Sequence, residues 1–166
     1  MKSYINEYEF HITVDMLDQI SDLRVTDGKI DDIINSEKGS RIASEALSFL
    51  SADWTSKNLR YEQDHLHPYD RFEGTAPMGV SREDWILWRG NRNRLPNLQL
   101  LEGRSNGSKS DMPLIEYYSD MNDEQREKFC RDSLIPKGVS LEIRDFGTFY
   151  EKRKALLEER LRKLLG

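Results

Sequence analysis

The side chains best suited to chemistry lie in the middle of the chain, where Asp64 and His65 are neighbours and Asn106 follows further along. A carboxylate and an amide oxygen are hard donors of the kind that bind Mg²⁺, an ion that keeps several waters and needs only one or two protein groups. A neutral imidazole, whose ordinary pKa is near ~6.5, is well matched to taking a proton from water at neutral pH. Asp64 and Asn106 are therefore suitable metal ligands, and His65 is a suitable general base.

Hydrolysis of a phosphodiester needs this combination, because the anionic substrate repels a nucleophile until its charge is neutralised. Lys109 stands three residues after Asn106, on the same face of a predicted helix, and can contact a phosphate as a point charge. Adjacent residues of a regular strand point to opposite faces, so Asp64 and His65 can share a cleft only where their strand ends or bulges. Pro68, three residues after His65, favours such an end.

Asn97 stands just before a second predicted strand. It is better placed to pin the long connecting loop, through hydrogen bonds to the backbone, than to bind a metal ion. From that position it would orient His65 indirectly. His67 can be interpreted as a second ligand or a substrate contact, but packing beside Pro68 is the favoured interpretation, and His11 is interpreted as structural.

Residues 89–109 form a basic segment with a net charge of +4, because its five basic residues are accompanied by Glu102 alone. The candidates for gripping a nucleic-acid backbone are Arg89, Arg92, Arg94 and Arg104. An ordinary solvated loop is the alternative. Trp85 and Trp88 can stack on bases, but their spacing favours the anchoring of a helix. The basic residues near the C-terminus, including Arg153, alternate with glutamates and are interpreted as a solvated helix face.

Short elements must bring these side chains together. Apolar spacing predicts helices at residues 13–23, 30–34 and 41–50. Two short strands are predicted at 59–64 and 98–101, with a helix at 81–89 between them and a helix start at 105–110. Further helices are predicted at 113–118, 122–132 and 145–165. The predicted fold class is therefore α+β and mostly helical.

The composition excludes several classes of protein. With 166 residues, including 7 Tyr, 6 Phe and 3 Trp, the chain has the size and aromatic content of one packed domain. Its single cysteine, Cys130, excludes an internal disulfide and a cysteine-built zinc site. No apolar run approaches the ~20 residues of a membrane span, and the N-terminus lacks the pattern of a signal peptide, so a cytoplasmic protein is expected. The net charge of −5 argues weakly against a general nucleic-acid coat protein, although a local basic strip can still bind phosphate.

Taken in order, Asp64-His65…Asn97…Asn106-x-x-Lys109 resembles the HNH motif of the His-Me finger (ββα-metal) nucleases, with asparagine in place of the final histidine. The Asn-Leu-Gln-Leu-Leu strand and the helices around it are similar to the C-terminal nuclease part of bacterial proteins that also carry a ParB-like domain. That group includes modification-dependent restriction and anti-phage enzymes. The resemblance implies that Asp64 and Asn106 hold Mg²⁺ (or Mn²⁺), that His65 is the general base, and that Asn97 holds the loop.

The resemblance also implies how the chain is organised. A ββα-metal core at 58–112, with a long insertion at 66–96, would be flanked by helical sections at 1–57 and 113–166 in one compact unit. The insertion is long for the motif, so positions within it cannot be matched to the family. No ParB-like domain is found in the sequence, so we expect either a fragment of a larger protein or a nuclease module without its sensor.

The expected function is metal-dependent endonucleolytic cleavage of DNA in bacterial restriction or anti-phage defence. Nothing in the chain is of a kind that reads base sequence, so we expect weak specificity and strongly salt-dependent binding. Two alternatives stay open at this point. One is an inactive nucleic-acid- or protein-binding module on the same scaffold, and the other is a ribonuclease that uses the same centre.

Overall fold

The computed structural model describes residues 26–52, 55, 60–102, 109 and 111–165. Two predicted site residues, Arg104 and Asn106, lie outside the described residues, as do the helix predicted at 13–23 and most of the helix start predicted at 105–110. The described part forms one antiparallel pair of strands surrounded by helices. This arrangement confirms the α+β, mostly helical class.

Two capped helices form the N-terminal part of the described chain. Thr26 caps α2 (Asp27–Ile34) and Ser40 caps α3 (Arg41–Leu50), each through a side-chain oxygen that accepts a hydrogen bond from a backbone amide. The bounds of α3 are those predicted from its apolar spacing. The buried residues of the two helices are Ile30, Ile34, Ala43, Ala46, Leu47 and Leu50. They supply one side of a hydrophobic core that the strands complete.

The hairpin consists of β1 (Tyr61–His65) and β2 (Leu98–Glu102), which pair in antiparallel register. Asp64 lies opposite Gln99, and His65 lies opposite Leu98. β1 ends at His65, one residue later than the sequence predicted. The candidate base is therefore the last residue of its strand.

A long connection joins the two strands. It contains η1 (Tyr69–Phe72), α4 (Arg82–Asn91) and η2 (Leu95–Asn97). The hydroxyl of Ser81 caps α4 by accepting the amide of Asp84 at 3.0 Å. Trp85 of α4 is buried in a second hydrophobic cluster with Phe72, Phe146 and Phe149, and Trp88 packs half-buried against this cluster. The preferred interpretation of both tryptophans, as anchors of this helix, is confirmed.

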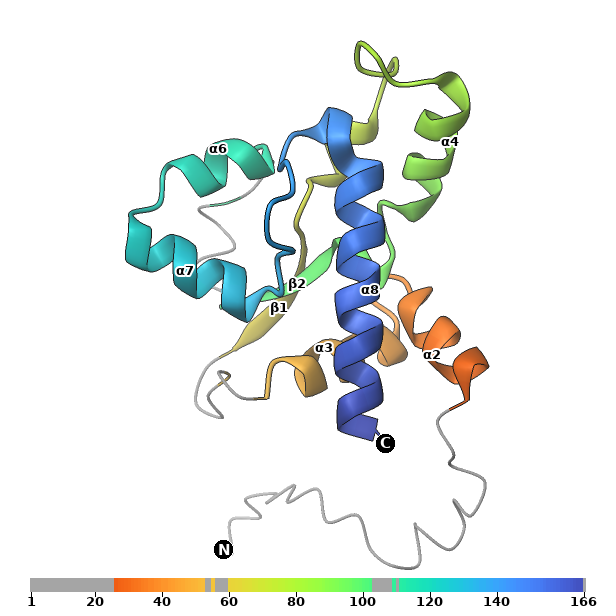
Figure 1. Ribbon diagram of the computed structural model, residues 1–166, viewed down its shortest axis with the longest axis vertical. Helices are drawn as coiled ribbons and strands as arrows, with labels where there is room; N and C mark the ends of the chain where they lie inside the picture. The colour runs from red at the N-terminus through yellow and green to blue at the C-terminus, as the bar shows by residue number, and fades with distance from the viewer. Residues whose placement is uncertain (1–25, 53–54, 56–59, 103–108, 110, 166) are drawn as a thin grey trace, which may run out of the picture.

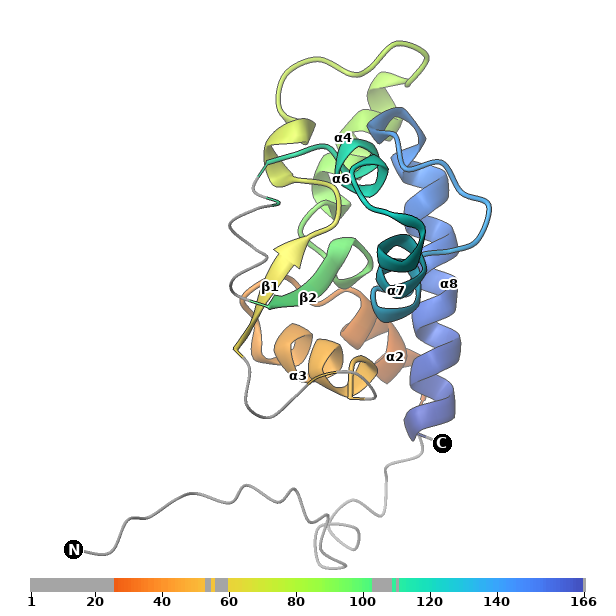
Figure 2. The same cartoon turned by 90° about the vertical axis from the view of Figure 1, so that its left-hand side faces the viewer.

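The C-terminal part is helical and is organised by its last helix. It contains α6 (Leu114–Ser119), α7 (Asp123–Asp132), η3 (Ile143–Asp145) and α8 (Phe146–Leu165). α8 runs the length of the folded part, with α4 packed near its start and α2 and α3 near its end (Figures 1 and 2). None of the helices in the described residues is long and apolar enough to cross a membrane.

Arg153 lies in the middle of α8 and is buried between two hydrophobic clusters. Its guanidinium donates hydrogen bonds to the carbonyl oxygens of Ser133, Leu95, Pro96 and Leu98, at 2.7–3.3 Å. Burial lowers the pKa of Arg153 to about 9, so the side chain remains charged at neutral pH. The interpretation of Arg153 as part of a solvated face is wrong. α8 crosses the start of β2 at this point, where the carbonyls need the several donors that a guanidinium supplies.

Candidate functional site

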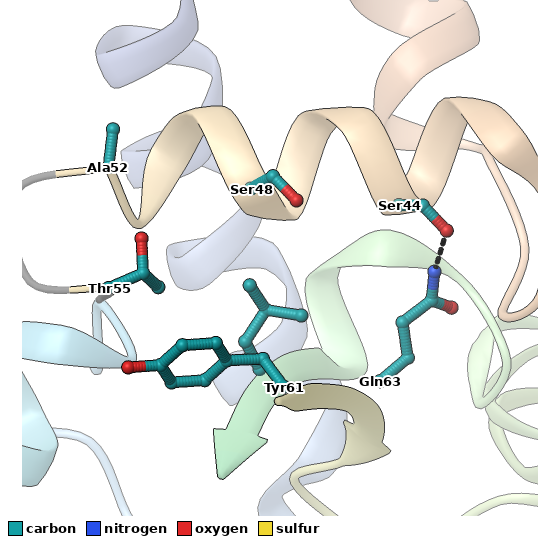
Figure 3. A pocket seen from close by; sticks show the side chains of 7 residues that line it. Ser44, Ser48, Ala52, Thr55, Tyr61 and Gln63 are labelled. Carbon is teal, nitrogen blue, oxygen red and sulfur yellow. Dashed lines mark hydrogen bonds between the residues drawn. The ribbon is translucent and has the colours of Figure 1, made fainter. Parts of the chain in front are cut away.

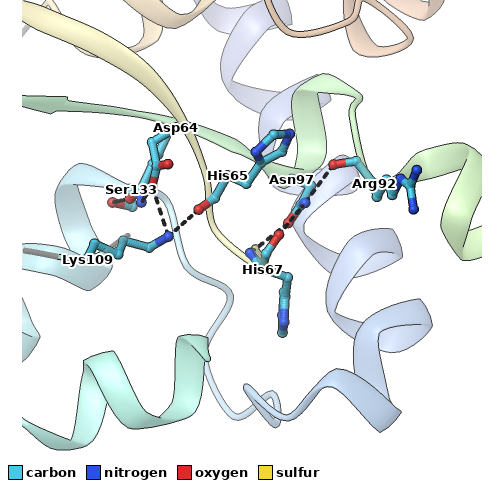
Figure 4. Close-up of polar contacts among 8 residues, drawn as sticks. Asp64, His65, His67, Arg92, Asn97, Lys109 and Ser133 are labelled. Atoms are coloured by element: carbon cyan, nitrogen blue, oxygen red, sulfur yellow. Dashed lines mark hydrogen bonds and ion pairs between the residues drawn. The ribbon is translucent and has the colours of Figure 1, made fainter. Parts of the chain in front are cut away.

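Asp64 and Lys109 form an ion pair beneath the hairpin. Lys109 Nζ lies 2.8 Å from Asp64 Oδ2 and also donates to the carbonyl oxygen of His65 (Figure 4). The side chain of Lys109 is fully buried, whereas that of Asp64 is 12% exposed. Gln99, opposite Asp64 in the sheet, donates to the same carboxylate oxygen at 3.3 Å and accepts a hydrogen bond from Ser133 at 3.1 Å. A polar network thus joins both strands, the segment after β2 and the segment after α7.

The charges of this pair depend on each other. Burial lowers the pKa of Lys109, while the charge of Asp64 and the hydrogen bond to it act in the opposite direction. Removing either partner would leave the other as an uncompensated charge in a region with little water. The sequence predicted that Lys109 contacts a substrate phosphate. In the structure its ammonium instead contacts Asp64 and the backbone of His65.

The imidazole of His65 points away from Lys109. Its Nε2 lies 3.0 Å from Oδ1 of Asn93, and its ring centroid lies 5.8 Å from that of Tyr69. Burial lowers the pKa of His65, and the positive charges of Lys38 and Lys109 lower it further, while Asn93 and Asp64 act in the opposite direction. A lowered pKa keeps the imidazole neutral at neutral pH, the form in which it can accept a proton.

The side chains of Asp64 and His65 have separate partners. The carboxylate contacts Lys109 and Gln99, whereas the imidazole contacts Asn93, so the two groups lie on opposite sides of the end of β1 (Figure 4). Their charges still interact, since Asp64 affects the pKa of His65. The structure therefore places both groups at one strand end without bringing them into contact.

Asn97 closes the long connection by bonding to backbone near both of its ends. Its Oδ1 accepts from the amide of His67 at 2.9 Å, and its Nδ2 donates to the carbonyl oxygens of His67 at 2.9 Å and Arg92 at 2.7 Å. The backbone carbonyl of Asn97 accepts from the amide of Leu66 at 2.8 Å. The prediction that Asn97 pins this loop through backbone hydrogen bonds is confirmed. These bonds fix the chain immediately after His65.

His67 is packed into the core. Its ring makes edge contacts with Phe146 and Phe149, with centroid separations of 5.4 and 4.8 Å. Burial lowers the pKa of His67 to about 3, and the nearby charges of Lys109 and Arg153 lower it as well. The preferred interpretation of His67, as a packed residue, is confirmed. The side chain of His67 is therefore part of the packed core that supports the hairpin.

Two of the candidate DNA-contacting arginines share a carboxylate. Arg92 lies 2.9 Å from Glu73 and stacks over Tyr69, with the guanidinium carbon 3.6 Å from the ring centroid. Arg89 lies 3.7 Å from the same glutamate, and its side chain is 43% exposed. Of this pair, Arg89 has the greater freedom to reach a ligand. Arg92 is held against η1, where it supports Tyr69 and thereby the surroundings of His65.

Arg94 is tied to the N-terminal helices. Its Nη1 donates to Oδ1 of Asn35 at 2.9 Å, and its backbone forms a bridge with Glu37. This arginine therefore links the segment before β2 to the turn between α2 and α3. The contact fixes the chain next to Asn93, the partner of His65.

The donor set around Asp64 fits a hard cation only in part. Among the described residues, no group of three or more His, Cys, Asp or Glu side chains could hold a metal ion. Mg²⁺ needs fewer protein groups than that, and the Asp64 carboxylate already lies against a positive charge at Lys109. Its predicted companion, Asn106, lies outside the described residues. Asp64 is thus suitable as one oxygen ligand.

No protein-family model and no curated protein matches the chain. The HNH interpretation therefore remains a prediction. It rests on the types and order of the residues and on the positions of Asp64, His65, Asn97 and Lys109 at one end of the hairpin.

Sequence reasoning missed Asn93, Gln99 and Ser133. Gln99 could have been found from the hairpin register, which places it opposite Asp64. Asn93 lies in an Asn-Arg-Asn-Arg run in which only the arginines were interpreted as candidate functional residues. Ser133 follows α7 and shows no local signal of its contact with Gln99.

A separate cavity of about 430 Å³ lies between α3 and the hairpin (Figure 3). It is lined by Ser44, Ser48, Ala52, Thr55, Tyr61, Gln63 and Leu100. Gln63 spans one side, donating to the hydroxyl of Ser44 at 2.5 Å and accepting from the amide of Gly39 at 2.7 Å. Among these residues there is no carboxylate, imidazole or ammonium, so we assign it no part in the chemistry.

Proposed function

We propose that the protein is a metal-dependent endonuclease of the HNH type that hydrolyses phosphodiester bonds, with DNA as its substrate. One observation carries the proposal: Lys109, from the segment after β2, packs on Asp64 and on the backbone of His65 at the end of β1. Lys109 is 44 residues from His65 along the chain. Its contact supports the idea that the segment after β2 approaches the end of β1, as a ββα-metal centre would need. Restriction or anti-phage defence is the proposed setting.

In this proposal His65 takes the proton from the attacking water. Its lowered pKa supports the role, because the imidazole is then neutral at neutral pH. Asp64, together with Asn106, would hold one Mg²⁺ or Mn²⁺ through oxygen atoms. When bound, the cation would neutralise charge on the scissile phosphate and on the leaving oxygen.

Two other residues prepare the site. Asn97 fixes the backbone directly after His65 and so limits where the imidazole can lie. Lys109 holds the Asp64 carboxylate through an ion pair at 2.8 Å and so limits where that carboxylate can lie. Among the candidate arginines within the described residues, Arg89 is the one whose exposure best suits contact with a DNA backbone.

A plasmid-nicking assay tests the proposal. The parent protein is compared with His65→Ala and Asp64→Asn, with Mg²⁺, with Mn²⁺ and with a chelator. Glu62→Gln is the matched control, since it removes an exposed carboxylate from the same strand. We expect metal-dependent nicking by the parent and the control, and its loss in both site variants. Absence of nicking by the parent with either metal, or nicking that persists in His65→Ala, would contradict the proposal.

A binding module without turnover is the second candidate. It is favoured by the Asp64–Lys109 pair, since a carboxylate satisfied by a buried lysine can be purely structural. Salt-dependent DNA binding by a parent protein that does not nick would support this candidate. RNA substrates assayed in parallel would identify a ribonuclease.

A longer cytoplasmic protein with a ParB-like sensor domain remains the proposed context.

A further inference from the structure

Asn93 is the described residue that bonds directly to the ring of His65. Its Oδ1 lies 3.0 Å from Nε2, and the two residues come from opposite ends of the long connection between the strands. A carboxamide oxygen accepts hydrogen bonds but cannot donate them, so it selects the imidazole form that carries its proton on Nε2. In that form the lone pair available for a proton lies on Nδ1.

The backbone around Asn93 is held firmly. Its carbonyl accepts from the amide of Lys38 at 2.9 Å, and the next residue, Arg94, bridges to Glu37. The amide of Leu95 donates to the carbonyl of Ser36 at 2.9 Å. The turn between α2 and α3 thus fixes the segment from which the Asn93 side chain extends. A side chain on such a fixed segment can orient a ring at little cost in conformational entropy.

The ring of His65 also has an aromatic neighbour. Tyr69 lies with its ring centroid 5.8 Å from that of His65, and the guanidinium of Arg92 stacks over the ring of Tyr69. Within the described residues, the ring of His65 has its hydrogen bond at Nε2 alone. Nδ1 is therefore the nitrogen left for a water or substrate.

We infer that Asn93 is a positioning residue for His65, which holds the imidazole in its Nε2–H form and leaves Nδ1 as the atom that accepts the proton. This inference rests on the proposed function for its catalytic meaning. The orientation of the ring and its tautomer can be measured without any DNA substrate.

The test is the ring ¹⁵N spectrum of His65 at a fixed alkaline pH, where imidazoles are neutral. The chain has three histidines, and His65→Gln identifies the signals of His65 by their loss. We expect the Nε2–H form in the parent and in Asn93→Asp, which keeps the acceptor oxygen. Asn93→Leu should give a mixture of the two forms. Tyr69→Leu is the matched control, because it removes a ring neighbour while leaving the hydrogen bond, and should keep the Nε2–H form.

The Nδ1–H form in the parent, or an unchanged spectrum in Asn93→Leu, would overturn the inference. Amide spectra of each variant show whether it has folded. In the nicking assay, Asn93→Leu should lower kcat by about 10- to 100-fold with little change in KM, and Asn93→Asp should recover most of that loss. The ring spectrum and the nicking assay test the two claims independently. A parent protein that shows the expected tautomer but cleaves no DNA would overturn the proposed function and leave the ring orientation established.

Discussion

Lys109 Nζ lies 2.8 Å from Asp64 Oδ2 at a point where the lysine side chain has no exposed surface. The pair links the segment after β2 to the end of β1. A charge in such surroundings is tolerated because its partner is present. Removing one partner leaves the other as a buried charge without compensation. The stability of the protein should therefore report directly on this contact.

Lys109→Met should lower the free energy of unfolding by about 3 kcal/mol, because it leaves the largely buried Asp64 carboxylate without its counter-charge. Asp64→Asn combined with Lys109→Met should cost less than the two single changes added together, since the double variant has no stranded charge. Urea denaturation measures both effects. Lys163→Met is the control, because its pair with Glu159 is exposed, and it should change the stability little. Additive costs in the double variant would contradict a coupled pair.

Addition of Mg²⁺ should stabilise Lys109→Met more than the parent. In the parent the ammonium competes with a cation for the Asp64 carboxylate, whereas in the variant no ammonium competes. A ligand that binds only the folded state raises its stability in proportion to the logarithm of ligand concentration. Thermal melts at increasing Mg²⁺ concentration would show the difference. Equal shifts in Lys109→Met and in Lys109→Met combined with Asp64→Asn would show that the cation binds elsewhere.

Asn97→Asp should destabilise the protein at least as much as Asn97→Ala, by about 2–3 kcal/mol, although the aspartate has the same shape. The amide nitrogen of Asn97 donates to the carbonyls of His67 and Arg92, and a carboxylate would face those oxygens with negative charge. Urea denaturation of the two variants provides the comparison. A stable Asn97→Asp protein would indicate that the loop is held by other contacts.

The elements that the sequence predicted well are those with local signals. α3, α4 and α7 each begin after a serine or asparagine whose side chain accepts a backbone amide, and such caps can be read within a few residues. The order of Asp64, Asn97 and Lys109 could likewise be read along the chain. Their contacts could not, because they depend on how the hairpin docks on the helices.

The residues that sequence reasoning missed are those whose partners are distant in the chain. Asn93 is 28 residues from His65, Ser133 is 34 from Gln99, and Arg153 is 55 from Leu98. Each polar group gains its role only when another element presents an unsatisfied donor or acceptor to it. An alternating charge pattern placed Arg153 in solvent because the pattern contains no information about the carbonyls that α8 crosses.

The stability of the protein should fall as the pH falls from about 6.5 to 5, in part because of His67. Its pKa is lowered to about 3 by burial, whereas in the unfolded chain it returns to about 6.5. Unfolding in this range therefore takes up a proton, and the free energy of unfolding decreases by up to about 1.4 kcal/mol per pH unit. His67→Gln should show a shallower decrease in urea denaturation across this range. Identical slopes would mean that His67 is protonated in the folded state.

Gly147→Ala should separate α4 from α8 or strain their contact. A Cβ atom at Gly147, in the first turn of α8, would lie 2.8 Å from Nε1 and 3.0 Å from Cε2 of Trp88. The indole cannot easily move away, because it also packs against Trp85 and Phe146. We expect a loss of about 1–3 kcal/mol in the free energy of unfolding.

Gly90→Ala is the matched control for this change. Gly90 lies in α4, where an added Cβ meets no heavy atom within 4 Å, so alanine should stabilise the helix by about 0.5–1 kcal/mol. Trp88→Phe should recover part of the loss caused by Gly147→Ala, because the smaller ring leaves room for the methyl group. Urea denaturation of the single and double variants decides between the outcomes. Equal effects of alanine at the two glycines would show that Trp88 of α4 does not pack closely on the start of α8.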